Sequence, residues 1–312
     1  MRVVLWLGPV ASYQVAKATL PDADRFIVIG GGCGPGAGDP SCQGSSYFSK
    51  LADGWFDGTN YLPKLLKSKG VDPTADPEVF IGSFSAGHGA VKKFCMSPDD
   101  RRLIQGIALA DSTYCSWPNK VPQFSEGYVR YCVDAVRGPR LFVATASASV
   151  DPAGNTPAGD QCMMAIKAEV EKRTGVQFRA SPNWPAGINP QPVAVWQAGN
   201  CIFADYGSKL QHPQHATILA PQVWSQLVTP WTVAPQTCFP VAAAPLDGLG
   251  DTWAPPAGTA ELCTMWGRWP SGAVVPALAE EPGAATKMLA FGAGGLAAFG
   301  VLRAIQYAMA AR

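Results

Sequence analysis

The chain has 312 residues, of which 47% are apolar and only 15% are charged, and its formal net charge is +1. This apolar content is enough to bury a large core, and it excludes an intrinsically disordered chain. Because the net charge is close to zero and no basic stripe alternates with aromatic residues, we expect no binding to nucleic acid.

Short apolar runs alternate with helix-length segments over most of the chain. The runs are continuously apolar, a pattern typical of strands that are covered on both faces. Strands are expected at residues 2–7, 25–30, 78–83, 104–110, 140–146 and 192–197. Helices are expected at residues 11–20, 47–69, 86–95, 123–136, 159–174 and 213–228. This alternation predicts an α/β fold: a three-layer α/β/α sandwich with a mainly parallel sheet of about six strands.

The composition changes after Trp231, where the first domain (residues 1–231) is expected to end. Residues 232–286 are rich in Pro, Ala and Gly, and they predict a linker or an extended arm. Residues 287–312 predict a hydrophobic helix that Arg303 interrupts. Such a helix can cross a bilayer if the arginine reaches the interface, or it can pack in an assembly. We therefore expect residues 287–312 to be a membrane or assembly anchor. The protein is then expected to be membrane-associated, in a virion or a cell envelope. If this helix is not an anchor, we expect a cytoplasmic protein.

No cofactor or metal is expected. The nine cysteines form no C-x-x-C pair and no Cys/His cluster with zinc spacing. The glycine-rich run GGGCGPGAGD at residues 30–39 lacks both G-x-G-x-x-G before a helix and the lysine of a phosphate loop, so it is expected to border the active site instead of binding a nucleotide. Cys33 and Cys42 could form a disulfide around this loop, and the alternative is buried free thiols.

The segment VFIGSFSAGHGAVKKF, residues 79–94, places two serines between a predicted strand and a predicted helix. A strand, a tight turn of small residues and a helix form a nucleophile elbow, in which a strained turn exposes the serine hydroxyl. Ser85 has the small residues Ser83 and Gly87 two positions before and after it, although the strict pattern has Gly at the first of these positions. Ser85 is therefore the candidate nucleophile, and the alternative is a glycine-rich turn without chemistry.

A serine nucleophile needs a base, usually histidine, and a carboxylate that orients the base. The chain has three histidines. His88 lies on the same predicted helix as Ser85, so its side chain should point away from the hydroxyl. His212 and His215 lie at the start of the last predicted helix. Pro213 suits the first helical turn, and this places His212 in the preceding loop, from which it can reach the serine more easily.

The candidate acids follow predicted strands, at the edge where parallel sheets place their sites. They are Asp111, Asp151 and Asp205. Asp111 ranks first because it ends an apolar run abruptly, and Asp151 ranks second. Each aspartate could instead be a helix cap or a turn residue.

An oxyanion hole needs two backbone N–H donors. The N–H group of Ala86, directly after the nucleophile, supplies one by geometry. The second should come from the loop after the first strand. Since Pro9 has no N–H group, Val10 or Gly8 must supply it.

With these motifs the chain resembles the α/β-hydrolase superfamily over about residues 1–231. The resemblance rests on the segment GSFSAGHGA, on the order Ser, Asp, His along the chain, and on the six-strand layout. It implies a version with a trimmed N-terminus, whose first strand matches the third strand of the full fold. It also implies that the catalytic histidine follows the last strand, and that the usual acid comes one strand after Asp111, which favours Asp151. The C-terminal segment resembles the anchors of some virion and envelope proteins.

The sequence therefore predicts a serine hydrolase, most simply an esterase that forms an acyl-enzyme. The expected substrate is an ester, such as an ester of a cell envelope or of a polymer. Aromatic residues expected in loops at the active edge could line its binding site: Trp55, Phe56, Tyr61, Tyr114, Trp117 and Trp184. The alternative is a non-catalytic structural or attachment protein, because a hydrolase fold does not guarantee activity.

Overall fold

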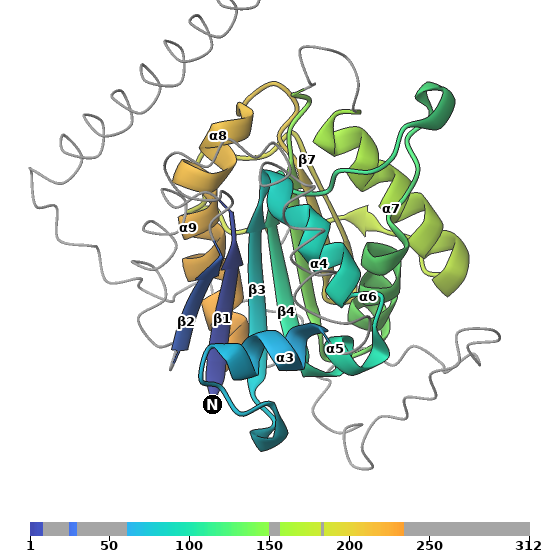
Figure 1. Ribbon diagram of the computed structural model, residues 1–312. Helices are drawn as coiled ribbons and strands as arrows, with labels where there is room; N and C mark the ends of the chain where they lie inside the picture. The colour runs from blue at the N-terminus through green and yellow to red at the C-terminus, as the bar shows by residue number, and fades with distance from the viewer. Residues whose placement is uncertain (9–24, 30–60, 150–156, 182–183, 234–312) are drawn as a thin grey trace, which may run out of the picture. The chain divides into compact units, whose positions relative to one another are not determined.

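An eight-stranded sheet runs through the part of the chain that the computed structural model describes, which is residues 1–8, 25–29, 61–149, 157–181 and 184–233 (Figure 1). The strands are β1 (Arg2–Leu7), β2 (Arg25–Ile29), β3 (Glu78–Phe84), β4 (Ile104–Ala110), β5 (Leu141–Ala146), β6 (Arg179–Ala180), β7 (Ala194–Ala198) and β8 (Cys201–Asp205). The predicted α/β fold class is confirmed, with more strands than the six expected.

The strands lie in the order β2-β1-β3-β4-β5-β8-β7-β6. All neighbours from β2 to β8 are parallel, whereas β7 and β6 add an antiparallel edge. The carboxyl ends of the parallel strands therefore meet at one edge of the sheet, where open α/β sheets place their sites.

Strand β8 is the parallel strand that the sequence analysis missed. The run expected as the last strand, residues 192–197, forms the antiparallel β7, and the neighbour of β5 is Cys201–Asp205. Gly199 and Asn200 join β7 to β8 in a two-residue hairpin, with Gly199 at a φ of +56°. A Gly-Asn pair between two apolar runs is a hairpin signal, so β8 could have been found from the sequence.

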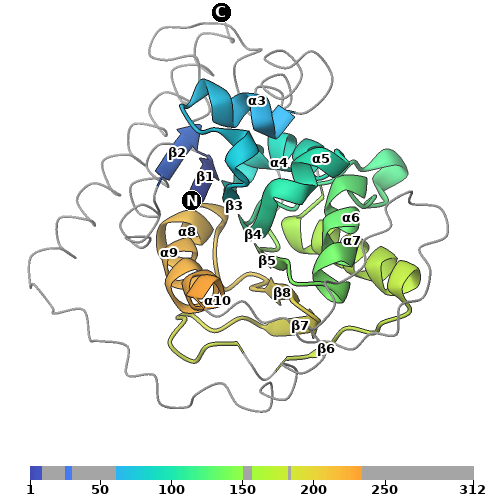
Figure 2. The same cartoon turned by 90° about the horizontal axis from the view of Figure 1, so that it is seen from below.

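Helices cover both faces of the sheet, as a three-layer sandwich requires (Figure 2). One face carries α3 (Tyr61–Ser68), α4 (His88–Phe94), α5 (Pro98–Leu103), α6 (Glu126–Arg137) and α7 (Gly159–Thr174). The other carries a continuous helical segment made of α8 (His212–Gln214), η5 (His215–Leu219), α9 (Ala220–Val223), η6 (Trp224–Val228) and α10 (Thr229–Val233). Helix α7 has the bounds predicted for the helix at residues 159–174, whereas α5 was not predicted. The helix expected at residues 11–20 lies outside the described residues.

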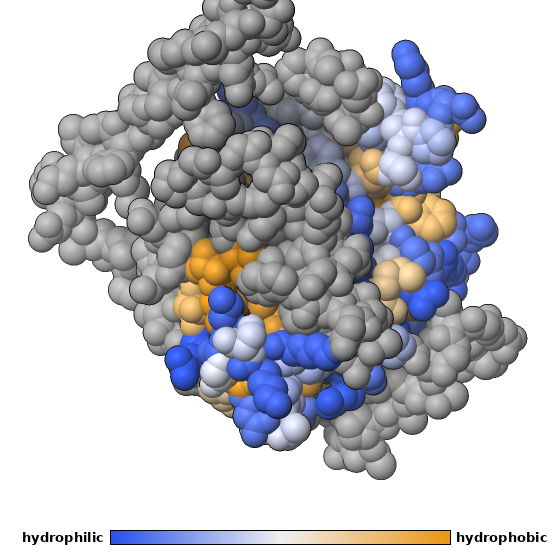
Figure 3. All heavy atoms as spheres, in the orientation of Figure 1, coloured by the Kyte–Doolittle hydropathy of each residue, from blue (hydrophilic) through white to orange (hydrophobic). Residues whose placement is uncertain are grey.

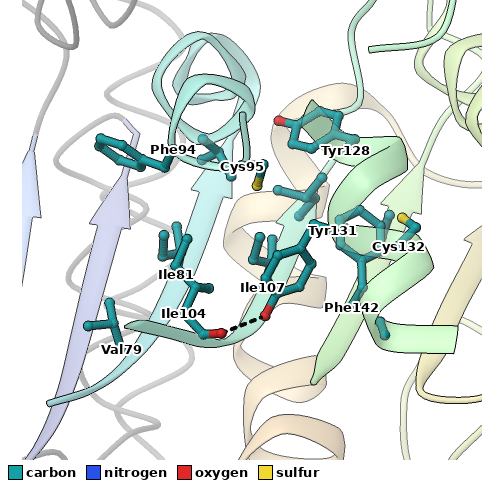
Figure 4. Close-up of a cluster of buried hydrophobic side chains, with 14 of the residues drawn as sticks. Val79, Ile81, Phe94, Cys95, Ile104, Ile107, Tyr128, Tyr131, Cys132 and Phe142 are labelled. Atoms are coloured by element: carbon teal, nitrogen blue, oxygen red, sulfur yellow. Dashed lines mark hydrogen bonds between the residues drawn. The ribbon is translucent and has the colours of Figure 1, made fainter. Parts of the chain in front are cut away.

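The main core lies between the sheet and the helices α4 and α6 (Figure 4). Its strand residues point toward Phe94 of α4 and Tyr131 of α6, both fully buried. The Tyr131 hydroxyl donates to the Ile104 carbonyl at 3.3 Å, so the phenol is buried with a hydrogen-bond partner. The strands β3, β4 and β5 are buried along almost their whole length, which explains their continuously apolar sequences.

Helix α3 illustrates how an amphipathic pattern decides which side faces the core. Leu62, Leu65 and Leu66 are fully buried, whereas Lys64 and Lys67 are exposed. This spacing places the leucines on one stripe of the helix. Figure 3 shows hydrophilic side chains gathered over α3 and the turn that follows it.

The C-terminal predictions fall almost wholly outside the described residues. Helix α10 ends at Val233, two residues beyond the expected domain boundary at Trp231. The rest of the arm at 232–286 and the anchor at 287–312 lie outside the described part. Among the helices that are described, none is long and apolar enough to cross a membrane.

Cys115 and Cys162 form a disulfide that joins the loop after β4 to α7. Cys95, Cys132 and Cys201 are buried free thiols, and burial raises the pKa of Cys95 and Cys132. The disulfide between Cys115 and Cys162 was not predicted from the sequence. The pair Cys33 and Cys42 lies outside the described residues.

Candidate active site

Ser85 lies on a strained turn between β3 and α4. Its φ is +52°, in the left-handed region that non-glycine residues rarely adopt. Ser85 is the first residue of the short helix η3 (Ser85–Gly87), which leads into α4. A Cβ atom at position 87 would collide with the Leu7 carbonyl of β1 and with the Ser83 hydroxyl, so only glycine fits there. This strand–turn–helix geometry is that of a nucleophile elbow.

Hydrogen bonds to the Ser85 carbonyl hold this turn in place. The Ser112 hydroxyl donates to it at 2.9 Å, and the Ser83 hydroxyl in turn donates to Ser112 at 2.8 Å. His88 Nδ1 lies 3.1 Å from the same carbonyl. Burial lowers the pKa of His88 to about 4, so this histidine is neutral near pH 7 and donates its Nδ1 proton. Ser83 is fully buried and Ser85 is partly exposed, so only Ser85 offers its hydroxyl at the surface.

A chain of hydrogen bonds joins Ser85, His212 and Asp111. His212 Nε2 lies 2.8 Å from Ser85 Oγ, and His212 Nδ1 lies 2.8 Å from Asp111 Oδ2. Because a carboxylate only accepts, the Nδ1 atom carries the proton and Nε2 is free to accept from the serine hydroxyl. The imidazole also stacks on Phe84, with ring centroids 4.6 Å apart.

The sheet order brings these three residues together. Asp111 directly follows β4, which pairs with β3, the strand that ends at Phe84 just before Ser85. Asp111 has a φ of +46° and is fully buried. His212 is the first residue of α8, with Gln211 as its N-cap. The expectation that His212 lies in the loop before the helix is therefore wrong.

His215, the alternative base, lies away from the serine. It is fully buried, its Nδ1 atom is 3.0 Å from the Thr145 hydroxyl, and its ring meets Tyr206 edge-on. The Thr145 hydroxyl also donates to the Leu109 carbonyl at 3.2 Å, so it accepts from His215 Nδ1. Burial lowers the pKa of His215 to about 4. These contacts are those of a structural histidine.

The remaining candidates are divided between the described part and the rest of the chain. Asp205 accepts from the Gly207 N–H group at 2.7 Å and is a turn residue at the end of β8. Gly8 donates its N–H group to the Ile29 carbonyl at 3.2 Å, so it is not available as the second oxyanion donor. Asp151 and Val10 lie outside the described residues.

Ala86 begins the turn into α4. Its N–H group belongs to the first turn of a helical segment, where N–H groups have no partner within the helix. The backbone position next to the serine hydroxyl therefore suits a donor to a developing oxyanion.

The loop after β4 adds a contact that the sequence did not reveal. The Tyr114 hydroxyl lies 3.2 Å from His212 Nδ1, and its ring packs on His88 with centroids 5.4 Å apart. The disulfide from Cys115 and a 2.8 Å bond from the Thr113 hydroxyl to the Gly159 carbonyl tie this loop to α7.

The other aromatic candidates for the substrate site are less informative. Trp117 is partly exposed, whereas Trp184 is buried and packs on Tyr206. Trp55, Phe56 and the side chain of Tyr61 lie outside the described residues. Within the described ranges, no group of three His, Cys, Asp or Glu side chains could hold a metal ion.

The fold and site together define an α/β protein with a hydrogen-bonded serine, histidine and aspartate at the carboxyl edge of its sheet. No protein-family model matches the chain, and no curated protein matches it. Among solved structures the chain is similar to LpqC, a poly(3-hydroxybutyrate) depolymerase from Bordetella parapertussis, with 12% sequence identity and a TM-score of 0.40 over 73% of this chain and 78% of that one. A likeness at this level carries no argument about function, which must rest on the site.

Proposed function

We propose that the protein is a serine hydrolase, most simply an esterase, with Ser85 as nucleophile, His212 as general base and Asp111 as the orienting carboxylate. The observation that carries the proposal is the hydrogen-bonded chain from Asp111 through His212 to Ser85, with both links at 2.8 Å. A serine on a left-handed turn that contacts an imidazole nitrogen is the arrangement in which a hydroxyl becomes nucleophilic.

In the proposed reaction, Ser85 Oγ attacks the ester carbonyl carbon while its proton passes to His212 Nε2. Asp111 stabilises the resulting imidazolium through Nδ1. The Ala86 N–H group donates to the oxyanion, and Val10 stays the expected second donor. The bond from the carbonyl carbon to the leaving oxygen then breaks, and His212 returns the proton to the departing alcohol. Water attacks the acyl-enzyme by the same route and releases the acid.

The proposed substrate is an ester, as the sequence analysis predicts, and more specifically an ester of a cell envelope or of a polymer. An ester fits this site because the residues named above supply a nucleophile, a base and an oxyanion donor, which acyl transfer requires. Attachment through residues 287–312 to a membrane or an assembly stays a separate prediction, which rests on composition alone.

Labelling with a fluorophosphonate probe tests the proposal directly. The wild-type protein should be labelled, Ser85→Ala should not, and Ser83→Ala, the matched control in the same motif, should still be labelled. With a short p-nitrophenyl ester, Ser85→Ala and His212→Ala should each lose a factor on the order of 10⁶ in kcat. A folded wild-type protein without labelling or hydrolysis would refute the proposal and leave the non-catalytic structural or attachment protein as the better description.

A further inference from the structure

Ser147 lies beside the candidate carboxylate in the sheet. It directly follows β5, whose neighbour β4 leads into Asp111, and Thr145 pairs with Ala110 in the register of these strands. The Asp111 N–H group donates to the Thr145 carbonyl at 2.8 Å, which extends the ladder by one residue. Asp111 and Ser147 are therefore adjacent at the carboxyl edge, and both are fully buried.

Ser147 binds both oxygens of the Asp111 carboxylate. Its hydroxyl donates to Oδ2 at 2.5 Å, and its backbone N–H group donates to Oδ1 at 3.1 Å. The direction of the hydroxyl bond is determined by its surroundings. The Ser149 N–H group donates to the Ser147 hydroxyl oxygen at 3.2 Å, and a carboxylate can only accept, so the hydroxyl proton points at Asp111.

Two kinds of constraint act on this carboxylate. Oδ2 accepts from both His212 and the Ser147 hydroxyl, while Oδ1 faces the backbone of Ser147 and of Gly159, where a Cβ atom would collide with it. A buried charge without hydrogen bonds is very costly, and several donors make it tolerable. The donors also determine the rotation of the carboxylate about its Cβ–Cγ bond, and hence where Oδ2 points.

We propose that Ser147 is a positioning residue for the hydrolase reaction: its hydroxyl holds Asp111 Oδ2 toward His212 Nδ1 and shares the negative charge. This inference rests on the proposed function, because it assigns Ser147 a role through the acid and base of that reaction. Ser147 does not contact the reacting serine itself. Its removal should therefore slow the chemical step without weakening substrate binding.

Ser147→Ala keeps the backbone donor and removes only the hydroxyl. We expect kcat to fall about 10- to 100-fold, the effect of one hydrogen bond to a charged group, with KM unchanged. The acidic limb of the pH–rate profile should move to higher pH, because a carboxylate that has lost a donor stabilises the imidazolium of the base more strongly. A variant that merely loosened the fold would lower the rate equally at every pH.

Ser149→Ala is the matched control, because its backbone N–H group still binds the Ser147 oxygen, and it should behave as wild type. If Ser147→Ala does not fold, Ser147→Cys preserves the side-chain size with a weak donor and should show the same two changes. Wild-type kcat and an unmoved acidic limb in the folded variant would overturn the inference. Failure of the proposed function is distinguishable, since the wild type would then show neither fluorophosphonate labelling nor hydrolysis.

Discussion

Replacing His215 with Phe should make the protein slightly less stable at neutral pH and more stable in acid. His215 is buried, and burial lowers its pKa from the usual 6.5 to about 4; nearby Asp111 opposes this shift and His212 adds to it. The unfolded chain therefore takes up a proton near pH 6.5, and the folded protein only near pH 4. The part of the free energy of unfolding that depends on neutral His215 is therefore fully present above pH 6.5, and it is lost progressively as the pH falls toward 4.

The size of the loss follows from the two pKa values. Between pH 7.5 and pH 4.5 this single histidine removes about 2–3 kcal/mol from the free energy of unfolding. Phe keeps the ring contact with Tyr206 but loses the 3.0 Å bond to Thr145, which costs about 1 kcal/mol. Thr145 still donates to Leu109, so no donor is left unpaired there. The variant should thus be about 1 kcal/mol less stable at pH 7.5 and about 1–2 kcal/mol more stable at pH 4.5.

Urea unfolding, monitored by tryptophan fluorescence at the two pH values, measures whether the order of stability of the two proteins reverses. Both proteins should carry Ser85→Ala, so that no reaction at the serine interferes. His88, whose pKa burial also lowers to about 4, contributes equally to both proteins and cancels in the difference. If the His215→Phe protein lost as much stability from pH 7.5 to pH 4.5 as the protein that keeps His215, the assignment of His215 as a buried neutral residue would be wrong.

Two further predictions concern the supports of the site. Gly87→Ala should cost about 3 kcal/mol or more in the free energy of unfolding, or abolish soluble expression, because the new Cβ meets the Leu7 carbonyl; a normal urea midpoint would contradict this. Replacing Cys115 and Cys162 with Ser should cost about 2–4 kcal/mol, because the disulfide closes a loop with a sequence separation of 47. Dithiothreitol should lower the wild-type urea midpoint similarly and leave the double variant unchanged, whereas equal sensitivity of the two proteins would count against the bond.

Local sequence determined the layers of this fold. Continuously apolar runs identified five of the six parallel strands, all except β8, and helix α7 was predicted with its observed ends, because burial on both faces and helical periodicity leave direct marks in the sequence. The small residues around Ser85 identified the elbow because so tight a turn leaves little room for side chains, and in the structure a Cβ atom at Gly87 would meet the Leu7 carbonyl of β1. The hairpin before β8 carried a readable signal as well.

Only the tertiary structure decided which polar residues meet. Asp111, His212 and Ser147 are far apart in sequence, and their contacts depend on β4 lying between β3 and β5 and on the segment that begins with α8 lying on the other face. His212 and His215 are one helical turn apart, and the sequence favoured His212 only slightly, yet one reaches Ser85 and the other is buried against Thr145. The disulfide between Cys115 and Cys162 has the same origin. Local patterns record burial and turn geometry, whereas the partner of a polar side chain depends on the packing of distant segments.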